Sequence, residues 1–172
     1  MVLDFYKRES TTDQRTLVHS TMGRLVSRAK GYEPGGKENS RRILSGHMRD
    51  VAAKHLWFRR ATRVLPVPGH RGAADTDLSY RFAEALRDDL GLAIARVDLR
   101  HGRRGPAKFM TPRERAALKD GFVVRENLQD ETVLVVDDLY HTGSTMGGVA
   151  KAARHAGAST VLGLAAARIF RY

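Results

Sequence analysis

Two adjacent carboxylates and a turn rich in glycine and hydroxyl residues stand together in the segment VLVVDDLYHTGST, Val133 to Thr145. A helical pattern follows the turn. The first N–H groups of a helix have no partner within it, and the helix dipole favours an anion there. Glycine in the turn lets the backbone approach a ligand closely. The turn therefore suits a phosphate monoester, and its predicted phosphate-binding residues are His141, Thr142, Gly143, Ser144 and Thr145.

The two acids, Asp137 and Asp138, repel a phosphate and must serve another purpose. They follow an apolar strand expected over residues 132–136, and ligands of an open parallel sheet lie at the carboxyl ends of its strands. Carboxylates accept hydrogen bonds from vicinal ribose hydroxyls, or bind a divalent cation that rests on those hydroxyls. Their charge would also stabilise positive charge that develops in a reaction. The segment as a whole indicates a site for a sugar phosphate.

Simpler interpretations exist for each half of the segment, because paired acids can form a plain turn and Thr-Gly-Ser-Thr a plain helix start. A receiver domain of a response regulator also has an apolar strand that ends in paired acids. It needs several further strand–helix units, however, and 34 residues follow Asp138. A nucleotide-binding P-loop is excluded because no lysine follows the glycine at the required position.

The apolar pattern predicts two helices in the first third of the chain, then strands that alternate with helices. Residues 132–136 are apolar on both faces, as in a parallel strand covered on both sides. We therefore predict an α/β fold, a parallel twisted sheet with helices on both faces, with residues 1–58 as a helical N-terminal extension or hood and residues 59–172 as the core. The expected strands are residues 63–67, 92–99, 122–124, 132–136 and 160–165. The expected helices are residues 17–29, one from near Ser40, one from near Asp75, a short one at the capping-box sequence Thr111-Pro112-Arg113-Glu114, and residues 145–155.

The net charge of +11 is unevenly distributed along the chain. Residues 1–55 carry +5, residues 56–72 carry +4 and residues 99–115 carry +5. The two short basic zones either meet around a polyanionic small molecule or belong to a nucleic-acid footprint. The absence of cysteine rules out disulfides, thiolate catalysis and cysteine-zinc sites. No apolar run is long enough to span a membrane and no signal peptide is visible, so we expect a cytoplasmic protein without a membrane partner.

The segment resembles the phosphoribosyl-pyrophosphate (PRPP) motif of type I phosphoribosyltransferases, with its apolar run, two acids and Thr/Gly/Thr turn. The strand VLPVP followed by Gly69-His70-Arg71 is similar to the pyrophosphate loop of that family. The basic segment Arg100–Lys108 stands where the family has a flexible catalytic loop. The closest likeness is to ComF-type proteins, from VLPVP to the terminal L-x-x-x-R, although the cysteine-rich zinc module usual in those proteins is missing here.

The resemblance implies the type I phosphoribosyltransferase fold and a Mg²⁺-dependent transfer of the 5-phosphoribosyl group from PRPP to a nitrogenous acceptor, either a nucleobase or an amine. Pyrophosphate is released. By the same resemblance, Asp137 and Asp138 hold the ribose hydroxyls and residues 141–145 wrap the 5′-phosphate. Mg²⁺ has no direct protein ligand, or is bound through the two acids. Both basic zones then face pyrophosphate, with pyrophosphate-binding residues Gly69, His70 and Arg71. The candidate catalytic residues are Asp137, Asp138, Arg103, Arg104 and Lys108.

Two points stay open in the sequence. The acceptor would be held by Phe170, Tyr172, the N-terminal helices, or several of these, and the family analogy suggests a homodimer. Alternatively, the fold could sense PRPP or a nucleotide while the basic N-terminal third binds nucleic acid. Such binding would weaken steeply as salt rises.

Overall fold

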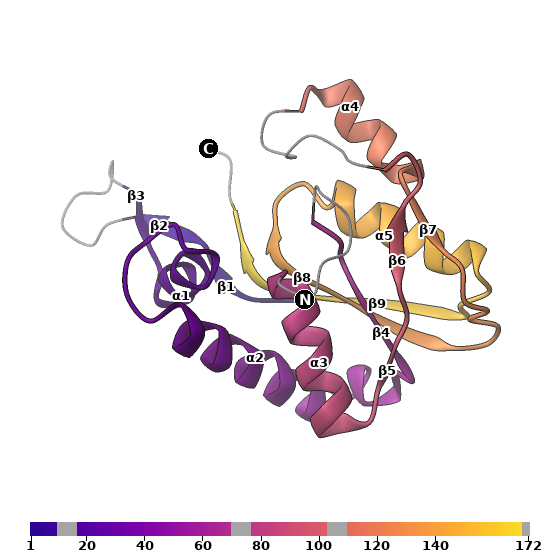
Figure 1. The fold of residues 1–172 in the computed structure, drawn as a ribbon, viewed down its shortest axis with the longest axis horizontal. Helices are drawn as coiled ribbons and strands as arrows, with labels where there is room; N and C mark the ends of the chain where they lie inside the picture. The colour runs from indigo at the N-terminus through magenta and orange to yellow at the C-terminus, as the bar shows by residue number, and fades with distance from the viewer. Residues whose placement is uncertain (10–16, 70–76, 103–109, 170–172) are drawn as a thin grey trace.

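The central feature of the molecule is a five-stranded, fully parallel sheet in the order β1-β9-β8-β4-β5 (Figure 1). This computed structural model describes residues 1–9, 17–69, 77–102 and 110–169. The sheet strands are β1 (Val2–Phe5), β4 (Arg63–Pro66), β5 (Ala93–Ile94), β8 (Thr132–Tyr140) and β9 (Thr160–Arg168). Both of the long strands, β8 and β9, lie inside the sheet, where the backbone can pair on either side.

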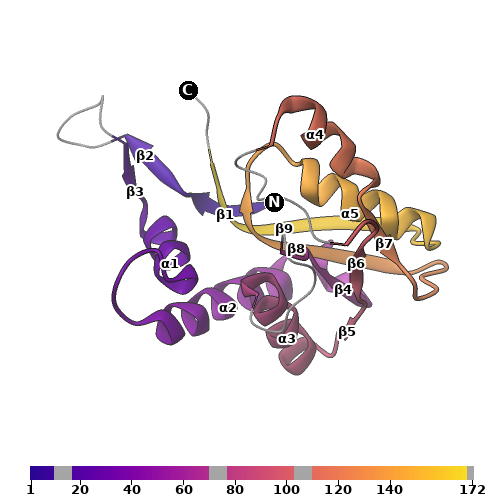
Figure 2. The same cartoon turned by 45° about the horizontal axis from the view of Figure 1, so that its top comes forward.

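Strand β8 divides its side chains between two buried layers. Successive side chains of a strand point to opposite faces of the sheet. Leu134 and Val136 pack with α1 (Thr21–Lys30), α2 (Lys37–Lys54) and α3 (Leu78–Leu90). Val133 and Val135 pack with α5 (Ser144–His155) on the other face. Figure 2 shows α2 and α3 on one side of the sheet and α5 on the other. The predicted α/β class, with helices on both faces of a parallel sheet, is confirmed.

A small substructure covers α5 from outside. It contains the antiparallel pair β6 (Val97–Leu99) and β7 (Phe122–Val124), the helix α4 (Pro112–Ala117) and the 3₁₀ turn Leu118–Asp120. The predicted single strand over residues 92–99 is wrong, because β5 pairs with β4 whereas β6 pairs with β7. The chain leaves the main sheet at Arg96, whose N–H donates to Glu126 Oε1 at 2.9 Å.

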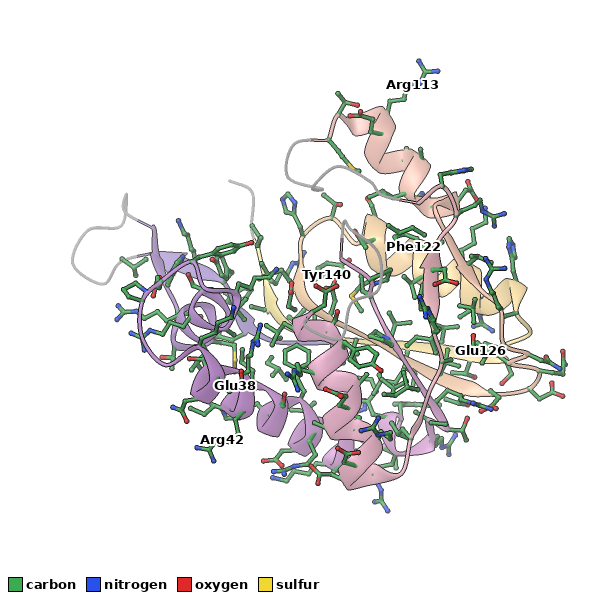
Figure 3. The ribbon with its side chains drawn as sticks, viewed as in Figure 1. Glu38, Arg42, Arg113, Phe122, Glu126 and Tyr140 are labelled. Carbon is green, nitrogen blue, oxygen red and sulfur yellow. The ribbon has the colours of Figure 1, made fainter. Side chains whose placement is uncertain are left out.

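The capping box predicted at the start of α4 is confirmed. The N–H of Glu114 donates to Thr111 Oγ1 at 3.2 Å, and the N–H of Thr111 donates to Glu114 Oε2 at 2.7 Å. These reciprocal bonds satisfy two donors at the helix start. Arg113, in the first turn, points away from the rest of the molecule (Figure 3).

The N-terminal third contains the two predicted helices but is not purely helical. Strand β1 joins the main sheet beside β9, and β2 (Lys7–Glu9) pairs with β3 (Leu17–His19). The helix predicted from Leu17 therefore begins later, at Thr21, because Ser20 caps it and accepts from the N–H of Gly23 at 2.9 Å. The boundary between residues 58 and 59 stays a prediction. No helix in the described part of the chain is both long enough and apolar enough to cross a membrane.

Candidate sugar-phosphate site

Strand β8 is longer than the sequence predicted, and both acids lie inside it. The expected strand ended at residue 136, but the pairing with β9 continues in register from Thr132 opposite Thr160 to Tyr140 opposite Arg168. Asp137 and Asp138 are thus strand residues near the carboxyl edge of the sheet, rather than the first residues after it. The turn begins at His141.

Because the two acids are consecutive in a strand, their side chains leave opposite faces. Asp138 continues the row of Leu134 and Val136 and reaches α1, where Lys30 contacts it. Asp137 continues the row of Val133 and Val135, on the α5 face. The acids that the sequence treats as one pair therefore meet different surroundings.

Asp137 shares a hollow with the predicted phosphate turn. The hollow has a volume of about 70 Å³, and Asp138 is not among the residues that line it. Asp137 and all five predicted phosphate-binding residues do line it, so the fold brings these sequence candidates together. The lining residues to which the sequence assigned no binding role are Leu118, Leu139, Tyr140 and Met146.

The turn itself leads directly into the N-terminus of α5. Gly143 is the N-cap residue in the left-handed conformation, with φ of 77°, and no side chain caps the helix. The first backbone bond of the helix runs from the N–H of Gly147 to the carbonyl of Gly143 at 2.7 Å. The three N–H groups before it belong to the helix start, where donors lack intrahelical partners. With the hydroxyls of Thr142 and Ser144, 3.0 Å apart, they form a cluster of donors suited to an anion.

Lys30 is the functional candidate that the sequence did not reveal. Its Nζ lies 2.8 Å from Oδ1 and 2.8 Å from Oδ2 of Asp138, and the two side chains are 25% and 16% exposed. Burial alone would lower the pKa of Lys30, but the charge of Asp138, a hydrogen bond to it and the charge of Asp137 together raise that pKa. Lys30 is therefore a cation beside the acids. A basic residue in the last turn of a helix is common, so nothing in its local sequence pointed to Asp138.

The predicted pyrophosphate loop begins beside the acids. The N–H of Val67, just after β4, donates to the carbonyl of Val136 at 2.9 Å. Two residues later the N–H of Gly69 donates to Asp77 Oδ2 at 3.1 Å. His70 and Arg71 lie outside the described residues, but the two ends of their segment are joined by this bond.

The resemblance implied that the basic zone 56–72 faces pyrophosphate, but three of its arginines lie away from the site. Arg59, Arg60 and Arg63 precede or begin β4, so they lie at the end of the sheet opposite the hollow. Arg63 Nε pairs there with Glu131 Oε1 at 3.0 Å. This part of the prediction is wrong, because residues before a parallel strand and residues after it lie at opposite edges of the sheet.

The candidate cations of the catalytic loop, Arg103, Arg104 and Lys108, lie outside the described residues. The stretch before them is fixed at the β6–β7 pair. The N–H of Arg100 donates to the carbonyl of Gly121 at 2.9 Å, and Arg100 Nε donates to the carbonyl of Asp120 at 3.0 Å. The predicted role of the loop stays a prediction.

The two acids are compatible with Mg²⁺ bound through one carboxylate together with water and phosphate oxygens. Within residues 1–9, 17–69, 77–102 and 110–169, no group of three or more His, Asp or Glu side chains could hold a metal. Mg²⁺ in phosphate-transfer sites is typically bound by one or two carboxylates, water and substrate phosphates. Asp137 can supply such a carboxylate, and the charge of Asp138 is already balanced by Lys30.

No protein-family model matches the chain, and no curated protein matches it. Among solved structures, the chain is similar to a purine phosphoribosyltransferase from Pyrococcus horikoshii Ot3. The two share 16% sequence identity, with a TM-score of 0.44, over 74% of this chain and 87% of the other.

Proposed function

We propose that this protein transfers the 5-phosphoribosyl group of PRPP to a nitrogenous acceptor, a nucleobase or an amine, and releases pyrophosphate in a Mg²⁺-dependent reaction. One observation carries the proposal: Asp137 and the whole turn 141–145 line the same hollow at the N-terminus of α5. A donor-rich turn for a phosphate and a carboxylate for sugar hydroxyls are the two halves of a sugar-phosphate site. The resemblance of VLVVDDLYHTGST to the PRPP motif supports the same substrate.

Different residues bind different parts of the substrate. The turn holds the 5′-phosphate, and the acids of β8 accept hydrogen bonds from the ribose hydroxyls. As the bond between C1 and the pyrophosphate oxygen breaks, its electron pair leaves with pyrophosphate and the ring becomes positively charged. Nearby carboxylate charge stabilises that ring more in the transition state than in the bound substrate. The acceptor nitrogen supplies the electron pair of the new bond and loses a proton.

The leaving pyrophosphate would lie beyond the end of β4. The N–H of Val67 is bonded to β8 next to the acids, which places Gly69 at the same edge of the sheet. Mg²⁺ bound to the pyrophosphate would neutralise part of its charge.

A direct assay tests this function. The chain is incubated with PRPP and Mg²⁺ and with each member of a panel of purines, pyrimidines and small amines, and pyrophosphate release is measured. At least one acceptor should give release above the acceptor-free rate, and Asp137→Asn should reduce it by about tenfold or more. A panel without release, together with no detectable PRPP binding, would refute the function.

A second candidate, a PRPP or nucleotide sensor that binds nucleic acid, is favoured by one surface feature. Trp57 is 54% exposed, and the guanidinium of Arg60 lies 5.0 Å from the centre of its ring. Exposed aromatic and arginine side chains together suit single-stranded nucleic acid. If this candidate is correct, Trp57→Ala should weaken oligonucleotide binding, and PRPP should change the affinity without pyrophosphate release.

A further inference from the structure

The ion pair between Lys30 and Asp138 joins the N-terminal helix α1 to the central strand of the sheet. The two residues are 108 positions apart in the chain, and both oxygens of Asp138 lie 2.8 Å from Lys30 Nζ. Neither side chain is more than about a quarter exposed. A partly buried pair in this geometry is not a loose surface contact, and removing one partner leaves a costly uncompensated charge.

The pair stands beside a second acid. Asp137 precedes Asp138 in β8, and its Oδ1 accepts a hydrogen bond from the N–H of Asp138 at 2.8 Å. Counted as formal charges, the Lys30 ammonium and the two carboxylates together carry one negative charge, whereas the two carboxylates alone would carry two. This matters because the proposed ligand is itself an anion, and two unbalanced carboxylates would repel its phosphate groups.

Asp138 can still accept a hydrogen bond while it is paired. A carboxylate offers about four acceptor sites on its two oxygens, and Lys30 uses one direction on each. The ammonium thus fixes the orientation of the carboxylate and leaves acceptor positions for a hydroxyl.

We propose that Lys30 is a positioning residue for the sugar half of the site: it fixes the Asp138 carboxylate and reduces the charge of the acid pair, so that an anionic sugar phosphate can bind beside two acids. This inference rests on the proposed function. It assigns to α1, in the N-terminal third of the chain, a part in substrate binding that acts through Asp138. It also predicts that Asp138 binds a divalent cation more tightly when Lys30 is removed, because its counter-ion is then lost.

The test compares Lys30→Met and Lys30→Arg with the wild-type protein. Calorimetric titration measures the affinity for ribose 5-phosphate and for 2-deoxyribose 5-phosphate, which differ in one hydroxyl. The matched control is Lys151→Met, which breaks the exposed pair of Lys151 with Asp120, 2.6 Å long and on the outer side of α5. Thermal unfolding and circular dichroism establish that each variant is folded.

Lys30→Met should weaken ribose 5-phosphate binding by at least about tenfold and remove most of the preference over the deoxy sugar. Lys30→Arg should retain much of the ribose 5-phosphate affinity and of the preference over 2-deoxyribose 5-phosphate. The control, Lys151→Met, should bind both sugars as the wild type does. Titration with Mn²⁺ alone should show tighter binding to Lys30→Met than to wild type, since the two acids are then unbalanced. A purely structural role for Lys30 would not produce this gain in metal affinity.

The experiment distinguishes a failure of the proposed role of Lys30 from a failure of the proposed function. If wild type binds ribose 5-phosphate and folded Lys30→Met binds both sugars and Mn²⁺ as wild type does, the role of Lys30 is refuted and the proposed function stands. If Lys30→Met does not fold, Lys30→Arg decides: loss of the hydroxyl preference in that charged variant also refutes the proposal. If wild type binds neither ribose 5-phosphate nor PRPP, both the proposed function and the role of Lys30 are refuted.

Discussion

Gly143 lies so close to the ring of Tyr140 that a Cβ atom at residue 143 would be 2.6 Å from Tyr140 Oη. Gly143 also has a φ of 77°, which side chains other than glycine rarely adopt. Two independent constraints, one of space and one of backbone conformation, therefore fix glycine in the turn that begins α5. Tyr140, the last residue of β8, is labelled near the centre of the view in Figure 3.

Gly143→Ala should disturb the turn and weaken the binding of inorganic phosphate and ribose 5-phosphate. The strain of a left-handed alanine costs about 1 kcal/mol or more before the contact with Tyr140 is counted, so we expect a loss of at least about fivefold in affinity. Calorimetric titration with both ligands measures it. Gly147→Ala is the matched control, because a Cβ at Gly147 meets nothing within 4 Å. Unchanged affinity in folded Gly143→Ala would mean that the turn does not hold the phosphate.

Neighbouring glycines in α5 should respond in opposite ways to alanine. A Cβ at Gly148 would lie 2.3 Å from the carbonyl oxygen of Leu118 and 2.7 Å from the Phe122 ring, which Figure 3 shows beside the helix. Gly148→Ala should lower the free energy of unfolding by about 1–3 kcal/mol through overpacking. Gly147→Ala should raise it by up to about 1 kcal/mol, because alanine is the better helix former. Urea denaturation measures the free energy of unfolding of both variants. An equal change in Gly147→Ala and Gly148→Ala would contradict the close packing at Gly148.

The central part of the fold was predictable because its signals are local. The apolar run of β8, the turn after it and the start of α5 follow one another within Thr132–Ser144. The capping box at Thr111 and Glu114 needs only four residues. Each of these elements is specified by side chains that lie next to one another in the chain.

The features that the sequence did not reveal depend on distant contacts. Strand β1 has four residues and exists through its pairing with β9, more than 150 positions away. The extension of β8 past Val136 likewise depends on β9, whose pairing continues to Arg168. The partner of Lys30 could not be found from local patterns either, since α1 and β8 meet only in the folded chain.

Glu131 should make folding stability depend on pH at the opposite end of the sheet. Its carboxylate accepts from the Thr62 hydroxyl and pairs with Arg63 Nε at 3.0 Å. The hydrogen bond from Thr62 contributes most to holding the pKa of Glu131 below its ordinary value of 4.5; burial opposes this effect and Arg63 adds to it. A pKa lowered by folding gives stability that is present above the unfolded pKa and is lost as pH falls through the folded pKa.

Glu131→Gln should therefore lower the free energy of unfolding near neutral pH and have a smaller effect in acid, below the folded pKa of Glu131. Urea titrations of both proteins over this range measure the difference. The control is Glu38→Gln on the outer side of α2, where the side chain is 75% exposed and the effect should be small at every pH. A pH-independent difference for Glu131→Gln would contradict the assigned cause.

Asp77 should support pyrophosphate binding by holding together the two ends of segment 70–76. Its Oδ2 accepts from the N–H of Gly69 at 3.1 Å, and a Cβ at Gly69 would lie 2.7 Å from the same oxygen. Asp77→Ala removes this bond to a charged acceptor, which should weaken pyrophosphate binding by about tenfold or more. Binding of ribose 5-phosphate should change little, because its phosphate is expected in the turn before α5. Asp77→Asn keeps an acceptor oxygen, so its pyrophosphate affinity should lie between those of the wild type and Asp77→Ala. An equal fall in the affinities of Asp77→Ala for pyrophosphate and ribose 5-phosphate would instead indicate general unfolding. An unchanged pyrophosphate affinity would mean that the segment after β4 does not bind the leaving group.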